Sequence, residues 1–479
     1  KMSSFILLII FNILPLNLLA QMKEVPVTTS SKEALNFFIS GRDKFENIEF
    51  VEAAPLFDKA IQVDPDFALA YLYRSQSGGG YNVLRQNLVK AVSFADKVSE
   101  GEKLQILYYQ ALVYGNGLKQ KECLDQLLES FPSDTRVQNL AGVHFYIMND
   151  FPTALVHFTK SSELDNNYAS VYNMIGYCQS ALGNYQEAEK AFQTYIKLIP
   201  DNPNPYDSYA ELLLKTGKYE ESIKQYKKAL EKDPMFTGSL AGIGNNYIFK
   251  DDYASARKYY QDYFDKGRTI DEKLAALYWK ATSFVYEGKI KEALTAFDEY
   301  RALAEKENLV PNSINSYNNQ GQLLAETGNS LEGMKYYQNG IDLMEKSKLQ
   351  EAEKESLITN SMLWRVYYLA ANGELDKATA ESEKCMLKVE SRRDPYEEMF
   401  LNSNIGYLEF KKGNYDKAIQ YFSKGLKESP FYWYYTAVAH NKKGDKQNAS
   451  ILFEKIAKWN VNSLDLALVR KRAIEEMRK

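Results

Sequence analysis

The stretch NPYDSYAELLLKTGKYEESIKQYKKALEKDP, residues 204–234, contains the pattern that decides the fold. Ala210 is followed after twelve positions by Ser222 and after four more by Tyr226, and the stretch closes with Ala229 and Pro234. Spacings of three, four, seven and eight residues keep side chains on one face of a helix, so the stretch predicts two short amphipathic helices whose apolar faces meet. Neither helix could bury its apolar face alone, so each such unit is expected to stack on its neighbours.

The same cluster recurs from Gly41 to Pro234 at a period of 34 residues and continues beyond it, with unit starts 40, 45 and 40 residues apart between residues 274 and 399. In the copy before the quoted stretch the small residue is Gly176 and the aromatic is Phe192. The small residue lets two helix backbones approach closely, and the aromatic fills the space above it. Glycines that suit the left-handed conformation ending a helix recur at the predicted turns between the two helices. They are Gly183, Gly217, Gly288, Gly328, Gly373, Gly413 and Gly444.

In nearly every signature position the quoted stretch resembles the tetratricopeptide repeat, and so does YNMIGYCQSALGNYQEAEKAFQTYIKLIP before it. Units that begin near residues 34, 68, 101, 135, 169, 203, 237, 274, 314, 359, 399 and 430 extend the resemblance over most of the chain. The resemblance implies an all-α fold, a right-handed superhelical solenoid of about twelve helix pairs with a C-terminal capping helix. It also implies a concave groove, lined by the first helix of each pair, that holds a partner peptide or protein.

The chain is expected to divide into five segments: a signal peptide (1–20), a short linker (21–33), a regular array (34–273), an array with longer helices (274–462) and the capping helix (463–479). The last element of a solenoid needs a polar outer face. The residues predicted to supply it are Arg470, Lys471, Arg472, Glu475, Glu476 and Arg478.

The N-terminus predicts export from a bacterial cell. Phe5 to Leu14 is an apolar run broken only by Asn12, and Ala20 before Gln21 suits signal peptidase. The expected product is a periplasmic or secreted protein cleaved after Ala20. The alternative is an uncleaved anchor, although the run is short for the roughly 20 residues that span a bilayer.

Composition and motifs argue against several functions. A net charge of -4 provides no clustered basic surface for nucleic acid, and no membrane contact is expected beyond the signal peptide. With only three histidines (His144, His157 and His440) and three cysteines, the chain offers no complete metal-ligand set and no disulfide framework. No catalytic residue, cofactor site or metal site is therefore assigned, and the chain is predicted not to be an enzyme.

The groove-facing positions implied by the resemblance lie close to the small residue of each first helix. They are Asn139, Asn173, Tyr177, Asp207, Asn245, Asn318, Asn319, Asn404 and Tyr407. An asparagine amide is both donor and acceptor, so a row of them could pair with the backbone of an extended peptide without reading its sequence. The alternative is that asparagine is only a tolerated polar residue on an exposed helix face.

The function expected from these features is a non-catalytic scaffold for protein–protein interaction, with a role in assembly or secretion. The alternative is a component of a surface glycan receptor, which the 36 tyrosines would favour because sugars stack on exposed aromatic rings. Most of the tyrosines are expected to lie in the core.

Overall fold

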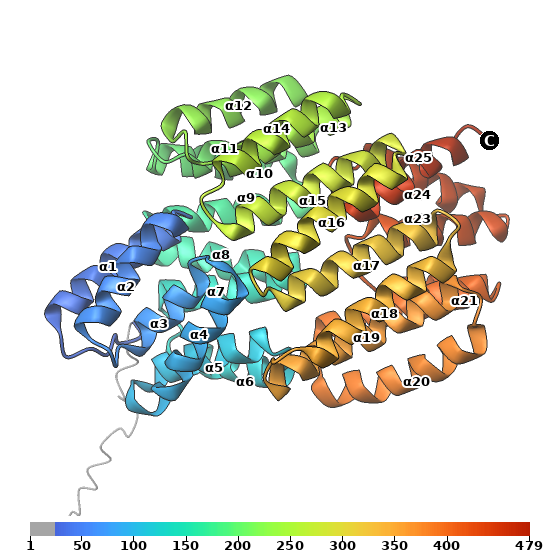
Figure 1. Cartoon of the computed structure of the whole chain (residues 1–479). Coiled ribbons are helices and arrows are strands. Elements are labelled where there is room, and N and C mark those ends of the chain that lie inside the picture. The colour runs from blue at the N-terminus through green and yellow to red at the C-terminus, as the bar shows by residue number, and fades with distance from the viewer. Residues whose placement is uncertain (1–23) are drawn as a thin grey trace, which may run out of the picture.

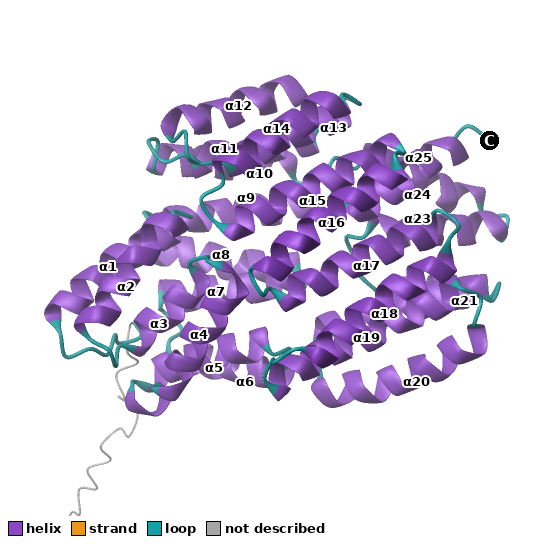
Figure 2. Ribbon diagram, viewed as in Figure 1, coloured by secondary structure: helices purple, strands orange, loops and turns teal. Residues whose placement is uncertain are grey.

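The structure, a computed structural model, describes residues 24–479 and is built entirely from helices over that range (Figures 1 and 2). It contains 25 α-helices within the described residues, and one 3-10 helix, η1 (Ala95–Lys97). No helix in residues 24–479 combines the length and the hydropathy that a membrane span needs. The predicted signal peptide and its cleavage site lie outside the described residues.

Helices α1 to α24 form twelve consecutive pairs, as the repeat predicted, and α25 (Leu464–Glu476) follows them. The first helices of the pairs are α1 (Lys32–Glu46), α3 (Ala68–Gln76), α5 (Glu100–Val113), α7 (Thr135–Ile147), α9 (Ala169–Ala181), α11 (Asn204–Lys215), α13 (Gly238–Phe249), α15 (Ile270–Glu287), α17 (Val310–Glu326), α19 (Glu351–Ala371), α21 (Pro395–Lys411) and α23 (Pro430–Lys442). The second helices are α2 (Phe50–Val63), α4 (Gly80–Ser93), α6 (Gly117–Ser130), α8 (Phe151–Leu164), α10 (Tyr185–Leu198), α12 (Tyr219–Lys232), α14 (Tyr253–Lys266), α16 (Ile290–Lys306), α18 (Ser330–Lys346), α20 (Leu375–Arg392), α22 (Tyr415–Lys424) and α24 (Lys446–Lys458).

The pair α9–α10 is held by the small residue and the aromatic that the sequence pattern identified. An added Cβ on Gly176 would lie 2.6 Å from the ring of Phe192, so that ring packs directly on the glycine backbone. Phe192 is fully buried. The turn between the two helices depends on a left-handed glycine, and Gly183 has a φ of 81°. A side chain at that position would be strained.

Early units of the array contact late ones. The Gly80 amide, at the start of α4, donates to Asp271 of α15 (3.0 Å), and the Tyr81 hydroxyl donates to Glu353 of α19 (3.1 Å). The guanidinium of Arg392 donates to the carbonyl of Gly115 (2.8 Å), which precedes α6. Units six or more repeats apart along the chain thus touch, so the solenoid coils back on itself and encloses its concave face.

The C-terminal helix α25 does more than cover the end of the array. It contacts α15, α17 and α23 as well as α24, and in Figure 1 it lies beside α15. Leu466 and Val469 are fully buried. The expectation that Arg472 belongs to a polar outer face is wrong, because its guanidinium pairs with the buried carboxylate of Glu326 on α17 (2.9 Å). Lys471 and Glu475 are exposed, as a polar outer face requires.

Candidate functional site

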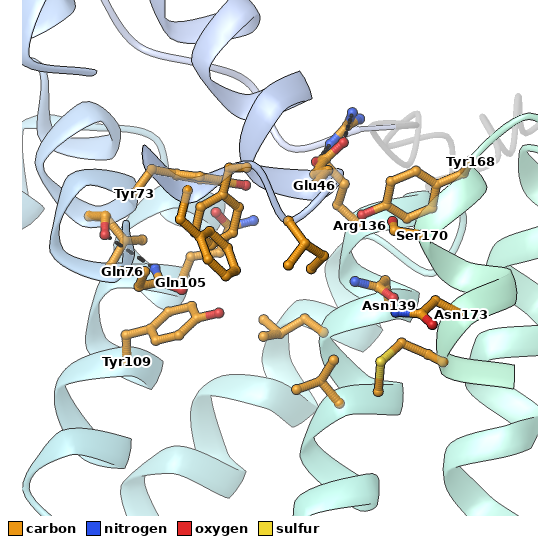
Figure 3. A pocket seen from close by; sticks show the side chains of 17 residues that line it. Glu46, Tyr73, Gln76, Gln105, Tyr109, Arg136, Asn139, Tyr168, Ser170 and Asn173 are labelled. Carbon is orange, nitrogen blue, oxygen red and sulfur yellow. Dashed lines mark hydrogen bonds and ion pairs between the residues drawn. The ribbon is translucent and has the colours of Figure 1, made fainter. Parts of the chain in front are cut away.

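A cavity of about 210 Å³ opens among the first helices α1, α3, α5, α7 and α9 (Figure 3). We call it the N-terminal pocket. Its polar and tyrosine side chains are Glu46, Tyr73, Gln76, Gln105, Tyr109, Arg136, Asn139, Tyr168, Ser170 and Asn173. The first helices of five consecutive units therefore contribute to one concave site, as the solenoid geometry requires.

Two of the predicted groove residues, Asn139 and Asn173, lie in this pocket on adjacent first helices. Their Oδ1 atoms are buried, and neither has a hydrogen-bond partner among the described residues. Asn173 is only 6% exposed. A buried acceptor without a donor costs about 1–3 kcal/mol, so both oxygens favour a ligand that supplies N–H groups.

A charged pair fixes one wall of the N-terminal pocket. Arg136 donates from Nε to Glu46 Oε1 (2.6 Å) and from Nη2 to Glu46 Oε2 (3.1 Å). The same guanidinium lies over the ring of Tyr168, 5.7 Å from its centroid. Burial raises the pKa of the Tyr168 hydroxyl well above its usual value, and it therefore stays protonated. The charges of Arg136 and Glu46 are paired with each other, so these groups line the pocket with polar atoms in fixed positions and with no unpaired charge of their own.

Arg136 and Glu46 were not among the residues singled out from the sequence. Arg136 precedes Asn139 by three positions, so the two share a helix face and this spacing could have identified it. Glu46 could not have been identified in this way, because its partner is 90 residues away along the chain.

Further along the concave face, Tyr177 and Asp207 belong to a second polar cluster. The Tyr177 hydroxyl donates to Glu211 Oε2 (2.6 Å), and the Ser239 hydroxyl donates to Asp207 Oδ1 (2.5 Å). Burial, with the charge of Glu211 adding to it, raises the pKa of the Asp207 carboxyl to about 7, although the Ser239 hydrogen bond acts in the opposite direction. Burial also raises the pKa of Glu211.

The raised pKa of Asp207 predicts a pH-dependent stability. Because the folded protein holds this proton more tightly than the unfolded chain, the group favours folding below the unfolded pKa of about 3.9, and that contribution is lost as the pH rises towards 7. Asp207→Asn, which keeps an acceptor for Ser239 but carries no charge, should be more stable than the parent by a larger margin at pH 8 than at pH 5. Urea denaturation at the two pH values measures this. Asp125→Asn, at an exposed site on α6, is the control and should show no such difference.

Asn245 is bonded to the chain's own C-terminal residues. Its Oδ1 accepts from the Tyr260 hydroxyl (2.8 Å) and from Asn462 Nδ2 (2.8 Å). Asn319 lines a different cavity, of about 640 Å³, together with Tyr278 and Asp465. The structure therefore places both residues on the concave face, in a region that the C-terminal segment occupies.

Three of the predicted groove residues, Asn318, Asn404 and Tyr407, lie in the protein interior and do not face an open groove. Asn404 is fully buried, donates to the carbonyl of Leu363 (2.9 Å) and accepts from the Tyr432 hydroxyl (2.7 Å). Asn318 and Tyr407 are buried as well. The physical reason for Asn404 is that α21 packs against α19 and α23, whose Leu363 carbonyl and Tyr432 hydroxyl bond both ends of its amide.

The histidines take structural positions. His144 Nδ1 lies 3.3 Å from the Tyr108 hydroxyl, and His157 Nδ1 lies 2.9 Å from Gln138 Oε1. Burial lowers the pKa of both rings, which favours their neutral forms. Across residues 24–479 no three His, Cys, Asp or Glu side chains are grouped as metal ligands would be.

Comparison with known proteins identifies the repeat. A family model described as the tetratricopeptide repeat matches residues 169–202 and 204–234, and a second model with the same description matches residues 404–460. The chain is similar to human tetratricopeptide repeat protein 13, with 28% identity over 36% of this chain and 19% of that protein. It is also similar to TPR repeat-containing protein MJ1428 of Methanocaldococcus jannaschii, with 22% identity over 44% of each chain. The chain thus spans less than half the length of either relative.

Solved structures with a similar fold include two tetratricopeptide repeat proteins, each 17% identical to this chain. One is YrrB, described as having an unusual peptide-binding site, with a TM-score of 0.26 over 38% of this chain and 91% of that one. The other comes from Parabacteroides merdae, with a TM-score of 0.34 over 57% of this chain and 98% of that one.

Proposed function

We propose that this protein is a non-catalytic binding protein whose N-terminal pocket holds an extended segment of a partner protein. The observation that carries the proposal is the pair of buried amide oxygens on Asn139 and Asn173, which lack donors among the described residues. Backbone N–H groups of an extended peptide are donors of the required kind, and adjacent first helices present the two acceptors side by side. The role we propose is assembly or secretion.

The aromatic lining fits the same ligand. Tyr73, Tyr109 and Tyr168 present flat, half-buried rings around the cavity, against which the side chains of a peptide can pack. A glycan receptor has no comparable support, because of the tyrosines only Tyr185 and Tyr396 are exposed, and they lie on separate helices.

The double variant Asn139→Ala/Asn173→Ala tests the proposal. A partner is first captured with the full chain and identified by mass spectrometry, and its bound segment is synthesised as a peptide. Loss of two hydrogen bonds, each worth about 0.5–1.5 kcal/mol, should weaken binding by about 5- to 150-fold in isothermal titration calorimetry. The stability of the variant should not fall, because the substitutions remove unsatisfied buried acceptors rather than satisfied ones.

The matched control is Asn184→Ala/Asn329→Ala, which removes two exposed amides at turns outside the pocket. This control should bind the peptide with the affinity of the parent. If both double variants bind like the parent, the partner does not use the pocket amides, and the proposal is contradicted.

We also infer that the protein is exported. The apolar run from Phe5 to Leu14 and the small residue Ala20 support cleavage by signal peptidase. When the chain is expressed in a bacterium, N-terminal sequencing of the soluble exported fraction should read from Gln21. Recovery of the chain in the membrane pellet with residues 2–20 intact would favour the uncleaved anchor instead.

A further inference from the structure

The concave face beyond the N-terminal pocket is occupied by residues 459–465 of the chain itself, which we call the C-terminal segment. It consists of the loop that follows α24 and the first two residues of α25, and it contacts helices of earlier units. Apart from local bonds with neighbouring residues and one with Ser429, its hydrogen-bond partners are 143 to 241 residues away along the chain. The segment therefore lies where the groove of the array would hold a separate peptide.

The contacts of the segment are those of a bound peptide. Asn460 Oδ1 accepts from the Tyr219 hydroxyl (3.2 Å), and Asn462 Nδ2 donates to Asn245 Oδ1 (2.8 Å). The backbone amide of Leu464 donates to the hydroxyl of Tyr278 (3.3 Å). These contacts involve units six, seven and eight in turn, so the segment crosses the stacked helices as an extended ligand of the groove would.

The segment leaves part of the surface that it contacts unfilled. A cavity of about 340 Å³ lies along Asn460 and Asn462, with Glu211 and Lys215 in its walls. Another cavity, of about 640 Å³, runs past Leu464. The Oδ1 atom of Asn462 is buried without a hydrogen-bond partner among the described residues. A permanent core element is normally close-packed and has its polar groups satisfied, and neither holds here.

The anchoring of the two flanking helices differs from that of the segment. Leu466 and Val469 of α25 are fully buried, as is Ile456 of α24. Val461, within the segment, is 42% exposed. Asn460 and Asn462 are each 7% exposed, so this loop is held mainly by its side-chain amides, whereas the helices on both sides are held by apolar side chains.

We propose that the central concave face, formed by Asn245 of α13 and Tyr278 of α15 with the hydroxyls of Tyr219 and Tyr260 reaching it from α12 and α14, is a second peptide-binding site for which residues 459–465 are the built-in ligand. The peptide class that it accepts shares the chemistry of WNVNSLD: two side-chain amides two positions apart, followed two positions later by leucine. This site is separate from the N-terminal pocket, and the proposal does not depend on what that pocket binds.

The test uses the full chain and a fluorescein-labelled synthetic peptide of residues 457–467. A tethered segment competes at an effective concentration in the millimolar range, so micromolar peptide should show little binding to the parent protein. Asn460→Ala/Asn462→Ala weakens only the tethered copy, and this variant should bind the peptide about tenfold or more tightly than the parent does in fluorescence anisotropy. Adding Asn245→Ala to the variant should reverse the gain.

The control variant is Glu454→Ala/Lys458→Ala, which removes an exposed ion pair on α24 and should bind the peptide as weakly as the parent does. Hydrogen–deuterium exchange provides the second measurement. In Asn460→Ala/Asn462→Ala, the amides of residues 459–463 should exchange faster while those of α25 after Asp465 stay protected. The proposal would be overturned if Asn460→Ala/Asn462→Ala bound the peptide with the same affinity as the parent. It would also be overturned if the amides throughout α25 lost their protection from exchange in that variant.

Discussion

Glu326→Ala is expected to lower the free energy of unfolding by about 3–5 kcal/mol, the range found when one partner of a buried charged network is removed. The side chain of Glu326 is only 3% exposed. Its carboxylate accepts hydrogen bonds from the hydroxyls of Tyr367 (2.9 Å) and Tyr435 (2.5 Å) and from Arg472 (2.9 Å). Alanine would leave these three donors, and the more distant Tyr407 hydroxyl (3.4 Å), without this acceptor. Urea denaturation followed by circular dichroism measures the loss.

The matched control is Glu332→Ala on α18. Its carboxylate forms an exposed pair with Lys335 three positions later, and such pairs contribute about 0–1 kcal/mol. Equal losses in the two variants would mean that α17, α19, α23 and α25 do not converge on Glu326, and the position of the C-terminal helix would be wrong.

Phe192→Ala should cost about 3–5 kcal/mol, because it removes a large buried ring and leaves a cavity between the helices of one unit. Phe192 is fully buried, packs on the backbone of Gly176 and meets the ring of Tyr177 edge to face, with centroids 5.3 Å apart. In a solenoid each unit depends on its neighbours, so the damage should spread to adjacent units. In urea denaturation, the circular dichroism signal of the helices should be lost at a lower urea concentration in Phe192→Ala than in the parent.

Val156→Ala on α8 is the control for this change, because the valine is 66% exposed and its truncation should alter stability by less than about 0.5 kcal/mol. If Phe192→Ala and Val156→Ala have the same midpoint, the assigned packing of the unit is incorrect.

The contrast between Phe192 and Asn404 shows what the sequence could predict. The pairing of Phe192 with Gly176 is local, since the two residues are sixteen positions apart and the repeat specifies their contact. The environment of Asn404 depends on two other helices, because its amide bonds the carbonyl of Leu363 and the hydroxyl of Tyr432. A groove position in a regular array becomes an interior position where long helices converge, and the repeat pattern contains no information on that convergence.

The C-terminal segment shows the same limit. Helix α25 could be predicted from its composition. Its position against the array could not, because its partners on α15 and α17 are more than 140 residues away along the chain. Of the predicted groove residues, Asn139 and Asn173 lie in an open cavity and Asn245 lies beneath the C-terminal segment. How tightly the superhelix coils decides which of them a partner can reach, and that coiling results from contacts between distant units such as Gly80 and Asp271.

Hydrogen–deuterium exchange of the full chain, with and without the peptide from the captured partner, tests most directly the claim that the N-terminal pocket is the binding site. Binding in the pocket should slow exchange in α5, α7 and α9, whose residues line the cavity, and should leave the outer helices α6, α8 and α10 unchanged. Protection confined to those outer helices, with none in α7 and α9, would contradict the account.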